Sequence, residues 1–399
     1  MKTAYIVDMV RTPVGKFGGT LATVRPDDLG THVIKALLER NPSFDKERVE
    51  DVIFGAANQA GEDNRNVARM AGLMAGLPIG SGGVTVNRLC ASGLQSIMDA
   101  SRALMLGEGQ AYIAGGVESM TRAPFVQGKN PAPFGRMVEM YDTTIGWRFT
   151  NPVLDEMYGT EGMGETAENV ADRYKLTREE QDEFAFHSQR KYQEAHDAGK
   201  FANELAPVSI PQRKGDPIVF DKDEHPRFST MDQLAKLKPA FRKGGSVTAG
   251  NSSGINDGAA ASLIVDEEIL KANNLTPKAR IVSVAIAGVE PTVMGLGPIP
   301  ATRKALQRAG LTVNDLDLIE LNEAFASQSI ACMRDLDLNP EIVNVNGGSI
   351  AIGHPLGCSG TRISTTLFHE MQKRDGVKYG LATMCIGVGQ GAAIIYEKL

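Results

Sequence analysis

Residues 86–93, VNRLCASG, set a cysteine between a strand-like run and an amphipathic helix. The run is VTVNRL, and after Cys90 the apolar side chains recur at helical spacing, at Leu94, Ile97, Met98, Leu104 and Met105. A strand that leads directly into a helix is the unit from which α/β proteins are built. Residues 86–93 therefore predict an α/β fold with a cysteine at a strand-to-helix junction.

Cys90 is the candidate nucleophile. A thiol at a helix N-terminus lies near unpaired main-chain amides and the positive end of the helix dipole, which stabilise the thiolate. We therefore expect the pKa of Cys90 to fall below the free value of about 8.5. Position alone leaves an alternative open, because most free cysteines are small buried core residues.

Strand-like runs flank this stretch on both sides. They are rich in Val and Ile without polar alternation, which is typical of strands covered by helices on both faces. The runs are 4–10, 50–56, 111–116, 260–265, 280–288, 317–322, 380–385 and 392–397. The two ends of the chain also resemble each other: residues 49–61 and 84–116 correspond to residues 316–328 and 343–389. This pattern predicts an internal duplication.

Residues 123–245 break the pattern. They contain the only tryptophan, Trp147, and one clear helix over residues 178–198. Thr177 and Glu180 have capping-box spacing at its start, and Gly199 stands where it ends. An insertion of this length is more than a connection, so we expect a lid or a separate binding subdomain.

Three further glycine-rich segments carry reactive side chains. His354 lies in GHPLGCSG, where glycines let backbone and substrate approach closely, and we expect it to take a proton from Cys90 and to donate to an oxyanion. The other five histidines are taken as surface or structural residues. Cys385, in MCIGVGQG, is a second thiol that can exchange a proton at carbon if its pKa is near the ordinary value, although a buried strand cysteine is the alternative. Asn322, in ELNEAF, cannot be a base but can hold a water molecule as an oxyanion donor.

Together, in this order, the four segments resemble the thiolase family, and the resemblance covers the whole chain. It implies the α/β thiolase fold: two similar βαβαβαββ-type halves in five layers, α-β-α-β-α, with an inserted loop domain. The implied boundaries are residues 1–122 plus 246–272 for the N-terminal half, 123–245 for a loop domain over the coenzyme A site, and 273–399 for the C-terminal half.

The resemblance also implies the site. Cys90 carries the acyl group, Cys385 protonates the acetyl-CoA enolate, and His354 and a water on Asn322 hold the enolate oxygen. The main-chain amides of Cys90 and Gly387 meet the acyl oxyanion. No metal and no permanently bound cofactor are expected, and coenzyme A is a substrate; the residues implied for its binding are Arg227, Ser253, Ala249, Met163, Met294 and Phe325.

The implied activity is that of a 3-ketoacyl-CoA thiolase (acetyl-CoA acyltransferase) of fatty acid β-oxidation. The segment YDTTIGWRFTNP also resembles thiolases that act on 3-oxoadipyl-CoA in aromatic catabolism. Biosynthetic acetoacetyl-CoA thiolases carry a histidine where this chain has Gly162. A ketosynthase would lack Cys385 and the NEAF segment, a silent acyl-CoA-binding relative would have lost a catalytic residue, and a papain-like hydrolase leaves Cys385 unexplained.

Composition sets broader limits. The formal charge of −6 gives no reason to expect nucleic acid as a partner, and no run approaches the roughly 20 apolar residues of a membrane span. The four cysteines have no CxxC spacing and the N-terminus does not look like a signal peptide, so we expect reduced thiols in the cytoplasm. As a thiolase-like chain, it is expected to form a homodimer or homotetramer.

Overall fold

The computed structural model describes residues 2–399, and its centre is a ten-stranded mixed sheet. One part follows the order β1-β10-β5-β3-β4 and the other β11-β14-β13-β12, with β2 paired to β10. The two parts meet through only two residue pairs, Tyr5 with Arg280 and Ile6 with Ala279. The strands are β1 (Tyr5–Arg11), β2 (Gly15–Lys16), β3 (Val49–Gly55), β4 (Gly82–Val86), β5 (Ala111–Ser119), β10 (Asn256–Val265), β11 (Ala279–Gly288), β12 (Leu318–Leu321), β13 (Tyr379–Ile386) and β14 (Gln390–Lys398).

The two parts repeat one pairing pattern, which confirms the predicted duplication. In the first, β10 pairs antiparallel with β1 and β5, and β5 pairs parallel with β3. In the second, β14 pairs antiparallel with β11 and β13, and β13 pairs parallel with β12. The parallel pairing of β3 with β4 has a shorter counterpart in the single parallel bridge between Ile319 and Val343.

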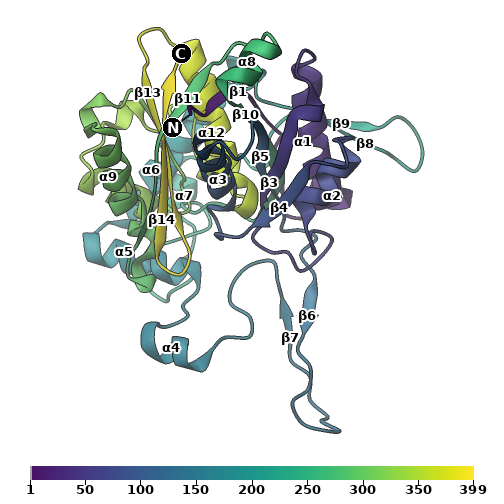
Figure 1. The fold of residues 1–399 in the computed structure, drawn as a ribbon. Helices are drawn as coiled ribbons and strands as arrows, with labels where there is room; N and C mark the ends of the chain where they lie inside the picture. Colours follow the sequence, from purple (N-terminus) through teal and green to yellow (C-terminus); the bar gives the residue numbers. More distant parts are fainter. Residues whose placement is uncertain (1) are drawn as a thin grey trace.

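Helices complete five layers, as expected (Figure 1). The helices α1 (Pro26–Arg40) and α2 (Val67–Met74) pack on the outer face of the first part of the sheet, and α9 (Pro298–Ala309) and α10 (Ala326–Asp335) on the outer side of the second. Between the two parts lie α3 (Ser92–Leu106) and α12 (Leu356–Lys373), which share one apolar core with both. The shorter α8 (Glu267–Ala272) and α11 (Ser349–Ile352) complete these halves.

Glycines bring the two central helices into backbone contact. A Cβ on Gly93 would lie 2.7 Å from the carbonyl oxygen of Gly357, and one on Gly360 would lie 2.1 Å from the amide nitrogen of Leu94. No side chain fits at either distance, so only glycine lets α3 and α12 approach this closely. The N-terminal ends of the two helices are thereby held against each other, and Cys90 and His354 each lie two residues before one of these ends.

The segment 123–245 contains more structure than the single helix predicted from the sequence. That helix is present as α6, with the expected capping box between Thr177 and Glu180. The sequence did not reveal α4, α5 and α7, of which α4 and α7 are short. The elements are β6 (Phe125–Gln127), β7 (Met140–Asp142), α4 (Pro152–Tyr158), α5 (Met163–Tyr174), α6 (Arg178–Asp197), β8 (Val208–Ile210), β9 (Ile218–Phe220) and α7 (Met231–Ala235).

A buried ion-pair cluster anchors this segment to the sheet. The guanidinium of Arg11, at the end of β1, pairs with Glu204 at 2.6 Å and with Asp223 at 2.7 Å. The hairpins β6–β7 and β8–β9 and helix α4 project from the body (Figure 1). The predicted division into three domains stays a prediction.

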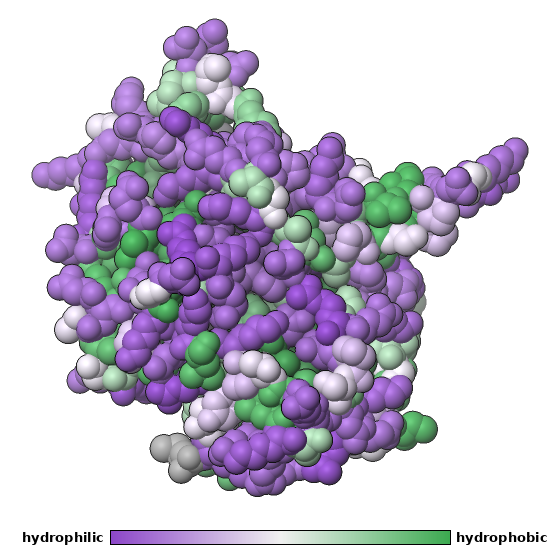
Figure 2. Space-filling model, turned by 90° about the horizontal axis from the view of Figure 1, so that it is seen from above, coloured by the Kyte–Doolittle hydropathy of each residue, from purple (hydrophilic) through white to green (hydrophobic). Residues whose placement is uncertain are grey.

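The face of the molecule seen in Figure 2 is mainly hydrophilic, with apolar side chains in scattered groups. Within residues 2–399, no helix has both the length and the apolar character needed to cross a membrane.

Candidate active site

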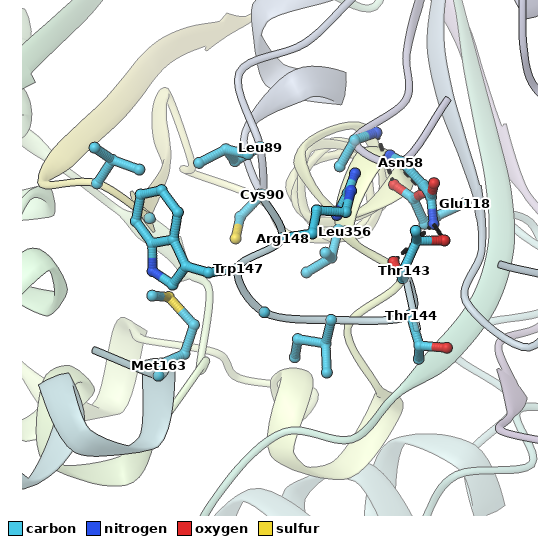
Figure 3. A pocket seen from close by; sticks show the side chains of 16 residues that line it. Asn58, Leu89, Cys90, Glu118, Thr143, Thr144, Trp147, Arg148, Met163 and Leu356 are labelled. Carbon is cyan, nitrogen blue, oxygen red and sulfur yellow. Dashed lines mark hydrogen bonds between the residues drawn. The ribbon is translucent and has the colours of Figure 1, made fainter. Parts of the chain in front are cut away.

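Cys90 lies in the tight turn between β4 and α3, and it lines a pocket (Figure 3). The preceding residue, Leu89, has φ of +47°, a left-handed conformation that non-glycine residues rarely adopt. Strained backbone of this kind persists only where surrounding structure enforces it, and it often occurs at functional sites. The turn holds the thiol of Cys90 at the pocket wall, so the predicted position at a strand-to-helix junction is confirmed.

The expected fall in the pKa of Cys90 is wrong. Burial raises the pKa of this thiol to about 11, although the main-chain amides of Gly387 and of Cys90 itself act in the opposite direction. The first helical residue of α3 is Ser92, so Cys90 lies outside the helix. The effect of the helix dipole on the thiol is therefore weaker than for a residue in the first turn. Desolvation therefore outweighs the effect of these amides, and the thiol is neutral at pH 7.

Cys385 lies near the C-terminal end of β13 and is fully buried. Burial raises its pKa well above the usual range, and the nearby Cys90 thiol adds to this rise. The expected ordinary pKa is thus also wrong, for the same physical reason. The mutual influence of the two thiols, and the Gly387 amide directed at Cys90, bring the ends of β13 and β4 to one place, as predicted.

His354 is held in one tautomer by its neighbours. Its Nδ1 lies 2.6 Å from the hydroxyl of Ser359, and that hydroxyl donates its only proton to the carbonyl of Pro355 at 2.8 Å. Nδ1 must therefore carry the proton, which leaves Nε2 as an acceptor. Burial and the charge of Arg362 lower the pKa of His354 to about 3, so this neutral form dominates at pH 7.

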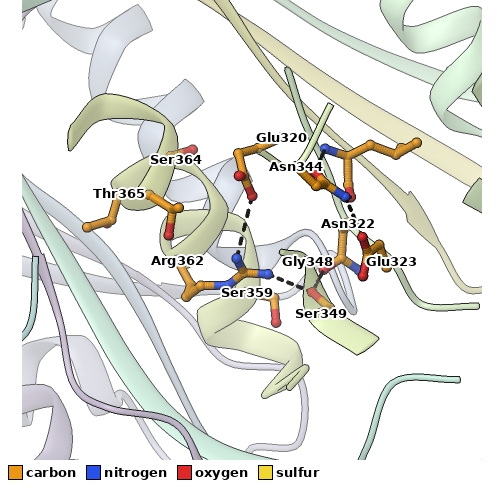
Figure 4. Close-up of polar contacts among 12 residues, drawn as sticks. Glu320, Asn322, Glu323, Asn344, Gly348, Ser349, Ser359, Arg362, Ser364 and Thr365 are labelled. Carbon is orange, nitrogen blue, oxygen red and sulfur yellow. Dashed lines mark hydrogen bonds and ion pairs between the residues drawn. The ribbon is translucent and has the colours of Figure 1, made fainter. Parts of the chain in front are cut away.

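Asn322 follows β12 and is held from its oxygen end (Figure 4). Ser349 donates to its Oδ1 at 2.5 Å, and Arg362 in turn donates to the Ser349 hydroxyl at 2.6 Å. The Asn322 Nδ2 then lies 3.5 Å from Nε2 of His354. Glu323 supports the same turn, because it accepts bonds from Ser188, Asn344 and Ile350.

Arg362 is a fully buried cation with weak compensation. Its guanidinium lies 3.6 Å from the carboxylate of Glu320, as Figure 4 shows. Burial lowers the pKa of Arg362 and raises that of Glu320 to about 8. Because the negative charge of Glu320 is reduced, the positive charge of Arg362 is not fully balanced. This charge lies near Ser349 and His354, so it favours negative charge that develops on a substrate bound at His354.

The pocket beside Cys90 is mostly apolar. Two of its lining residues carry ionisable charge, Arg148 and Glu118. Cys90 and Gly387 line this pocket, whereas Asn322, His354 and Cys385 are buried behind its wall. The remaining lining residues are Ala57, Asn58, Leu89, Thr143, Thr144, Ile145, Gly146, Trp147, Gly162, Met163, Leu356 and Val388.

The residues expected to bind coenzyme A fall into two groups. Arg227 and Ala249 line a second cavity, formed with α6 and α7, and the Arg227 guanidinium donates to the Ala249 carbonyl at 3.1 Å. Burial lowers the pKa of Arg227, which has no ion-pair partner within residues 2–399. The second group surrounds Cys385: Met163, Met294 and Phe325 pack in one apolar cluster with it.

Ser253 joins the second group through Ala324, a member of the same apolar cluster. Its main-chain amide donates to the carbonyl of Ala324 at 3.0 Å, and its side chain is partly exposed. The hydroxyl therefore remains available to a ligand. Within residues 2–399, no three side chains of His, Cys, Asp or Glu gather in the manner of a metal site.

Sequence reasoning missed four residues of the site. Ser349 and Ser359 lie inside the glycine-rich segment that drew attention to His354, but a serine there has no distinct signal. Arg362 lies in α12, two positions after Gly360, and a charged residue on an otherwise buried helix could have marked it. Arg148 lies in the segment YDTTIGWRFTNP, whose resemblance to other thiolases does not single out any one residue.

Comparison with known families gives two matches that together cover nearly the whole chain. Residues 4–268 match the thiolase N-terminal domain, and residues 275–398 match the thiolase C-terminal domain.

Individual proteins are similar over the same length. The 3-oxoadipyl-CoA/3-oxo-5,6-dehydrosuberyl-CoA thiolase of Escherichia coli K12 is 54% identical over 402 residues, covering 100% of both chains. An acetyl-CoA acetyltransferase of Syntrophomonas wolfei is 50% identical, covering 99% of this chain and 98% of its own. The crystal structure of human mitochondrial 3-ketoacyl-CoA thiolase in complex with CoA superposes with a TM-score of 0.92 at 41% identity, covering 100% of this chain and 98% of its own. With these relatives and this duplicated architecture, the chain belongs to the thiolase family.

Proposed function

We propose that this chain cleaves 3-oxoacyl-CoA with free coenzyme A, through an acyl group on Cys90, to give acetyl-CoA and a shortened acyl-CoA. The observation that carries the proposal is the proximity of two thiols, Cys90 on the pocket wall and Cys385 buried near it. The Gly387 amide is directed at the Cys90 sulfur, and the Cys90 thiol is close enough to Cys385 to raise the pKa of Cys385. A hydrolase with one nucleophile needs no second buried thiol.

In the first half-reaction, Cys90 attacks the 3-keto carbon and its proton passes to Nε2 of His354, which carries no proton in this tautomer. The bond between carbons 2 and 3 then breaks, and its electron pair remains on carbon 2 of the acetyl-CoA enolate. Cys385 donates its proton to that carbon. His354 and a water molecule held by the Asn322 amide stabilise the enolate oxygen.

In the second half-reaction, the Cys385 thiolate takes the proton of incoming coenzyme A. The new thiolate attacks the acyl group on Cys90, and the oxyanion is met by the amides of Cys90 and Gly387. The Cys90 thiolate leaves and regains its proton from His354, which restores the neutral resting site. The raised pKa values of both thiols and the lowered pKa of His354 agree with this resting state.

A direct assay tests the activity. Acetoacetyl-CoA mixed with free coenzyme A should yield acetyl-CoA, and Cys90→Ser should abolish the yield because a serine hydroxyl has no ionised fraction at neutral pH. After incubation with acetyl-CoA, mass spectrometry should find one acetyl group on the peptide that contains Cys90. An acetyl group on Cys385 instead would reverse the two roles.

For the substrate we propose 3-oxoadipyl-CoA, ahead of the unsubstituted 3-ketoacyl-CoA esters of fatty acid β-oxidation that the sequence favoured first. The E. coli relative at 54% identity carries a 3-oxoadipyl-CoA name. Six consecutive residues of YDTTIGWRFTNP, from Thr143 to Arg148, line the pocket beside Cys90. The acetyl-CoA acetyltransferase name of the S. wolfei relative keeps the biosynthetic reaction as the competitor.

Efficiency measured on the four-, six- and eight-carbon 3-oxoacyl thioesters and on 3-oxoadipyl-CoA decides between these substrates. A marked preference for the dicarboxylate supports the proposal. If efficiency instead rises from the four- to the eight-carbon thioester without a preference for the dicarboxylate, the substrates are the 3-ketoacyl-CoA esters of fatty acid degradation. If efficiency falls steadily beyond four carbons, the substrate is acetoacetyl-CoA.

We also propose a cytoplasmic homo-oligomer. The strand β4 is an edge strand with β3 as its one partner in the described sheet; Val84 within it is 40% exposed, and Ile79, shortly before it, is 85% exposed. Unpaired strand edges with apolar side chains are usually covered, and a second copy of the chain could cover this one.

All four thiols are free, which suits a reducing compartment such as the cytoplasm. Light scattering after size-exclusion chromatography tests the oligomer: a monomer would refute it.

A further inference from the structure

We propose that Arg148 selects the substrate by pairing with a carboxylate at the far end of its acyl chain. This inference rests on the proposed thiolase function and names the residue that would give preference for dicarboxylic substrates. It begins from the position of Arg148 on the wall of the same pocket as Cys90 (Figure 3).

Arg148 is the charge in this pocket that lacks a partner. Within residues 2–399 its guanidinium makes no hydrogen bond and lies within 4.0 Å of no carboxylate, although its side chain is only partly exposed. Arginine residues elsewhere on the chain, such as Arg122 and Arg242, are paired with carboxylates even where they are near the surface. A half-buried arginine without a partner in an apolar pocket is suited to an anionic ligand.

The other polar side chains of the pocket are already satisfied within the protein. Asn58 donates to Thr143, and the hydroxyls of Thr143 and Thr144 donate to the carbonyls of Pro124 and Met120. The indole of Trp147 donates to a main-chain carbonyl, that of Glu161, at 3.3 Å. The Arg148 guanidinium is therefore left as the group that can recognise a polar end of the acyl chain.

Glu118, the one carboxylate that lines this pocket, is not an ion-pair partner of Arg148. Its two oxygens accept bonds from the main-chain amides of Ala57, Asn58 and Gly357, at 2.7 to 3.1 Å. Burial raises the pKa of Glu118 to about 7, which reduces its negative charge. It holds the start of α12 against the 57–58 turn, and Arg148 remains unpaired beside it.

The backbone around Arg148 is fixed on both sides, so the side chain is presented from a set position. The bonds of Thr143, Thr144 and Trp147 hold the residues before it. Phe149, directly after it, has φ of +51°, and its ring packs on Tyr141 with centroids 4.8 Å apart. A preorganised cation loses less entropy on binding than a side chain on a mobile loop.

The chemistry of the substrate places its charge within the same pocket. In 3-oxoadipyl-CoA the distal carboxylate is three carbons from the carbonyl carbon that Cys90 attacks. An apolar pocket would leave that carboxylate desolvated without a partner, which is costly. A guanidinium can meet it with two parallel N–H bonds.

The test compares two six-carbon substrates that differ only at the far end, 3-oxoadipyl-CoA and 3-oxohexanoyl-CoA. Arg148→Gln should lower the ratio of their kcat/KM values about 10- to 150-fold, mainly through KM for the dicarboxylate, since a bond to a charged group is lost. Arg148→Lys should restore part of the ratio, because it keeps the charge without the fork. Arg136→Gln is the matched control: it removes an arginine of the same segment that is exposed and outside the pocket, and the ratio should not change.

Acetylation of Cys90 by acetyl-CoA, which needs no distal carboxylate, reports that the variant is folded. If the wild type prefers 3-oxoadipyl-CoA and Arg148→Gln keeps that preference, the role of Arg148 is refuted while the substrate proposal stands. If the wild type has no such preference, the substrate proposal fails first. An equal loss on both thioesters would mean that Arg148 holds the coenzyme A part, which also overturns this inference.

Discussion

The hydroxyl of Ser349 donates to Oδ1 of Asn322 at 2.5 Å, and this bond decides which end of the amide faces His354. With Oδ1 engaged, the Nδ2 donor is directed at Nε2 of His354, 3.5 Å away. Arg362 orients the serine by donating to its oxygen at 2.6 Å. Helix α12 thus sets the direction of a donor that lies on the other side of the site.

Ser349→Ala should therefore weaken carbon–carbon cleavage without removing a group that touches substrate. Once the amide is free to turn over, we expect a loss of about tenfold in kcat, smaller than the 10²–10³ expected for Asn322→Ala, which deletes an oxyanion donor. The measurement is cleavage of acetoacetyl-CoA beside acetylation of Cys90, which needs no enolate. Ser349→Thr keeps the hydroxyl and should recover most of the rate. Equal losses in both reactions would mean that the serine only supports the fold.

Cys385→Ala should separate the two half-reactions. Acetylation of Cys90 by acetyl-CoA requires no proton transfer at carbon, so it should survive, while cleavage of acetoacetyl-CoA should be lost. Cys332→Ala is a matched control, because Cys332 is another fully buried thiol in an apolar core, and its hydrogen bonds with Gln328 and Gly295 are weak. If Cys385→Ala abolishes acetylation as well, Cys385 helps to form the nucleophile and the division of roles is wrong.

The reactivity of the Cys90 thiol should rise with pH, because this thiol is protonated at neutral pH. Because burial raises the pKa of Cys90 to about 11, the thiolate fraction should grow about tenfold per pH unit up to that value. The rate of alkylation of Cys90 by iodoacetamide, followed by mass spectrometry of its peptide, should still be rising at pH 9. A plateau below pH 8 would instead indicate a thiolate–imidazolium pair in the free enzyme.

Much of the site follows from residue type and local pattern. Glycines around Cys90, His354 and Cys385 marked the places where backbone must approach closely, and the alternation of strands and helices gave the duplicated fold. Placement of Asn322 beside His354 also agrees with what the segments implied. These features are encoded within a few residues of each side chain, so one sequence suffices to find them.

The pKa values could not be found in this way. Cys90 packs against a core that includes residues of α12 and β13, and Cys385 packs with Met294 and Phe325. These neighbours are distant in sequence from the thiols that they bury, so no local pattern reveals the desolvation. The roles of Ser349 and Arg362 likewise depend on contacts between elements, and serine is too common to stand out. Arg148 matters because it lacks a partner, and a missing contact has no sequence pattern.

The last prediction concerns Gly162, which lines the pocket beside Cys90 and caps α5. It has φ of −64°, and a Cβ built there would meet no atom within 4 Å. A larger side chain should therefore fit the backbone and extend into free space. Gly162→His should shorten the space for the acyl chain without unfolding the protein.

Each buried methylene contributes about 0.8 kcal/mol, so the wild type should gain several-fold in kcat/KM from the four-carbon to the six-carbon 3-oxoacyl thioester. Gly162→His should abolish that gain while activity on acetoacetyl-CoA remains within a few-fold. Gly80→His is the matched control, because a Cβ at Gly80 is also unobstructed but lies outside this pocket. If Gly162→His lowers activity on the four-carbon substrate as much as on the six-carbon one, the glycine does not define the acyl end of the pocket.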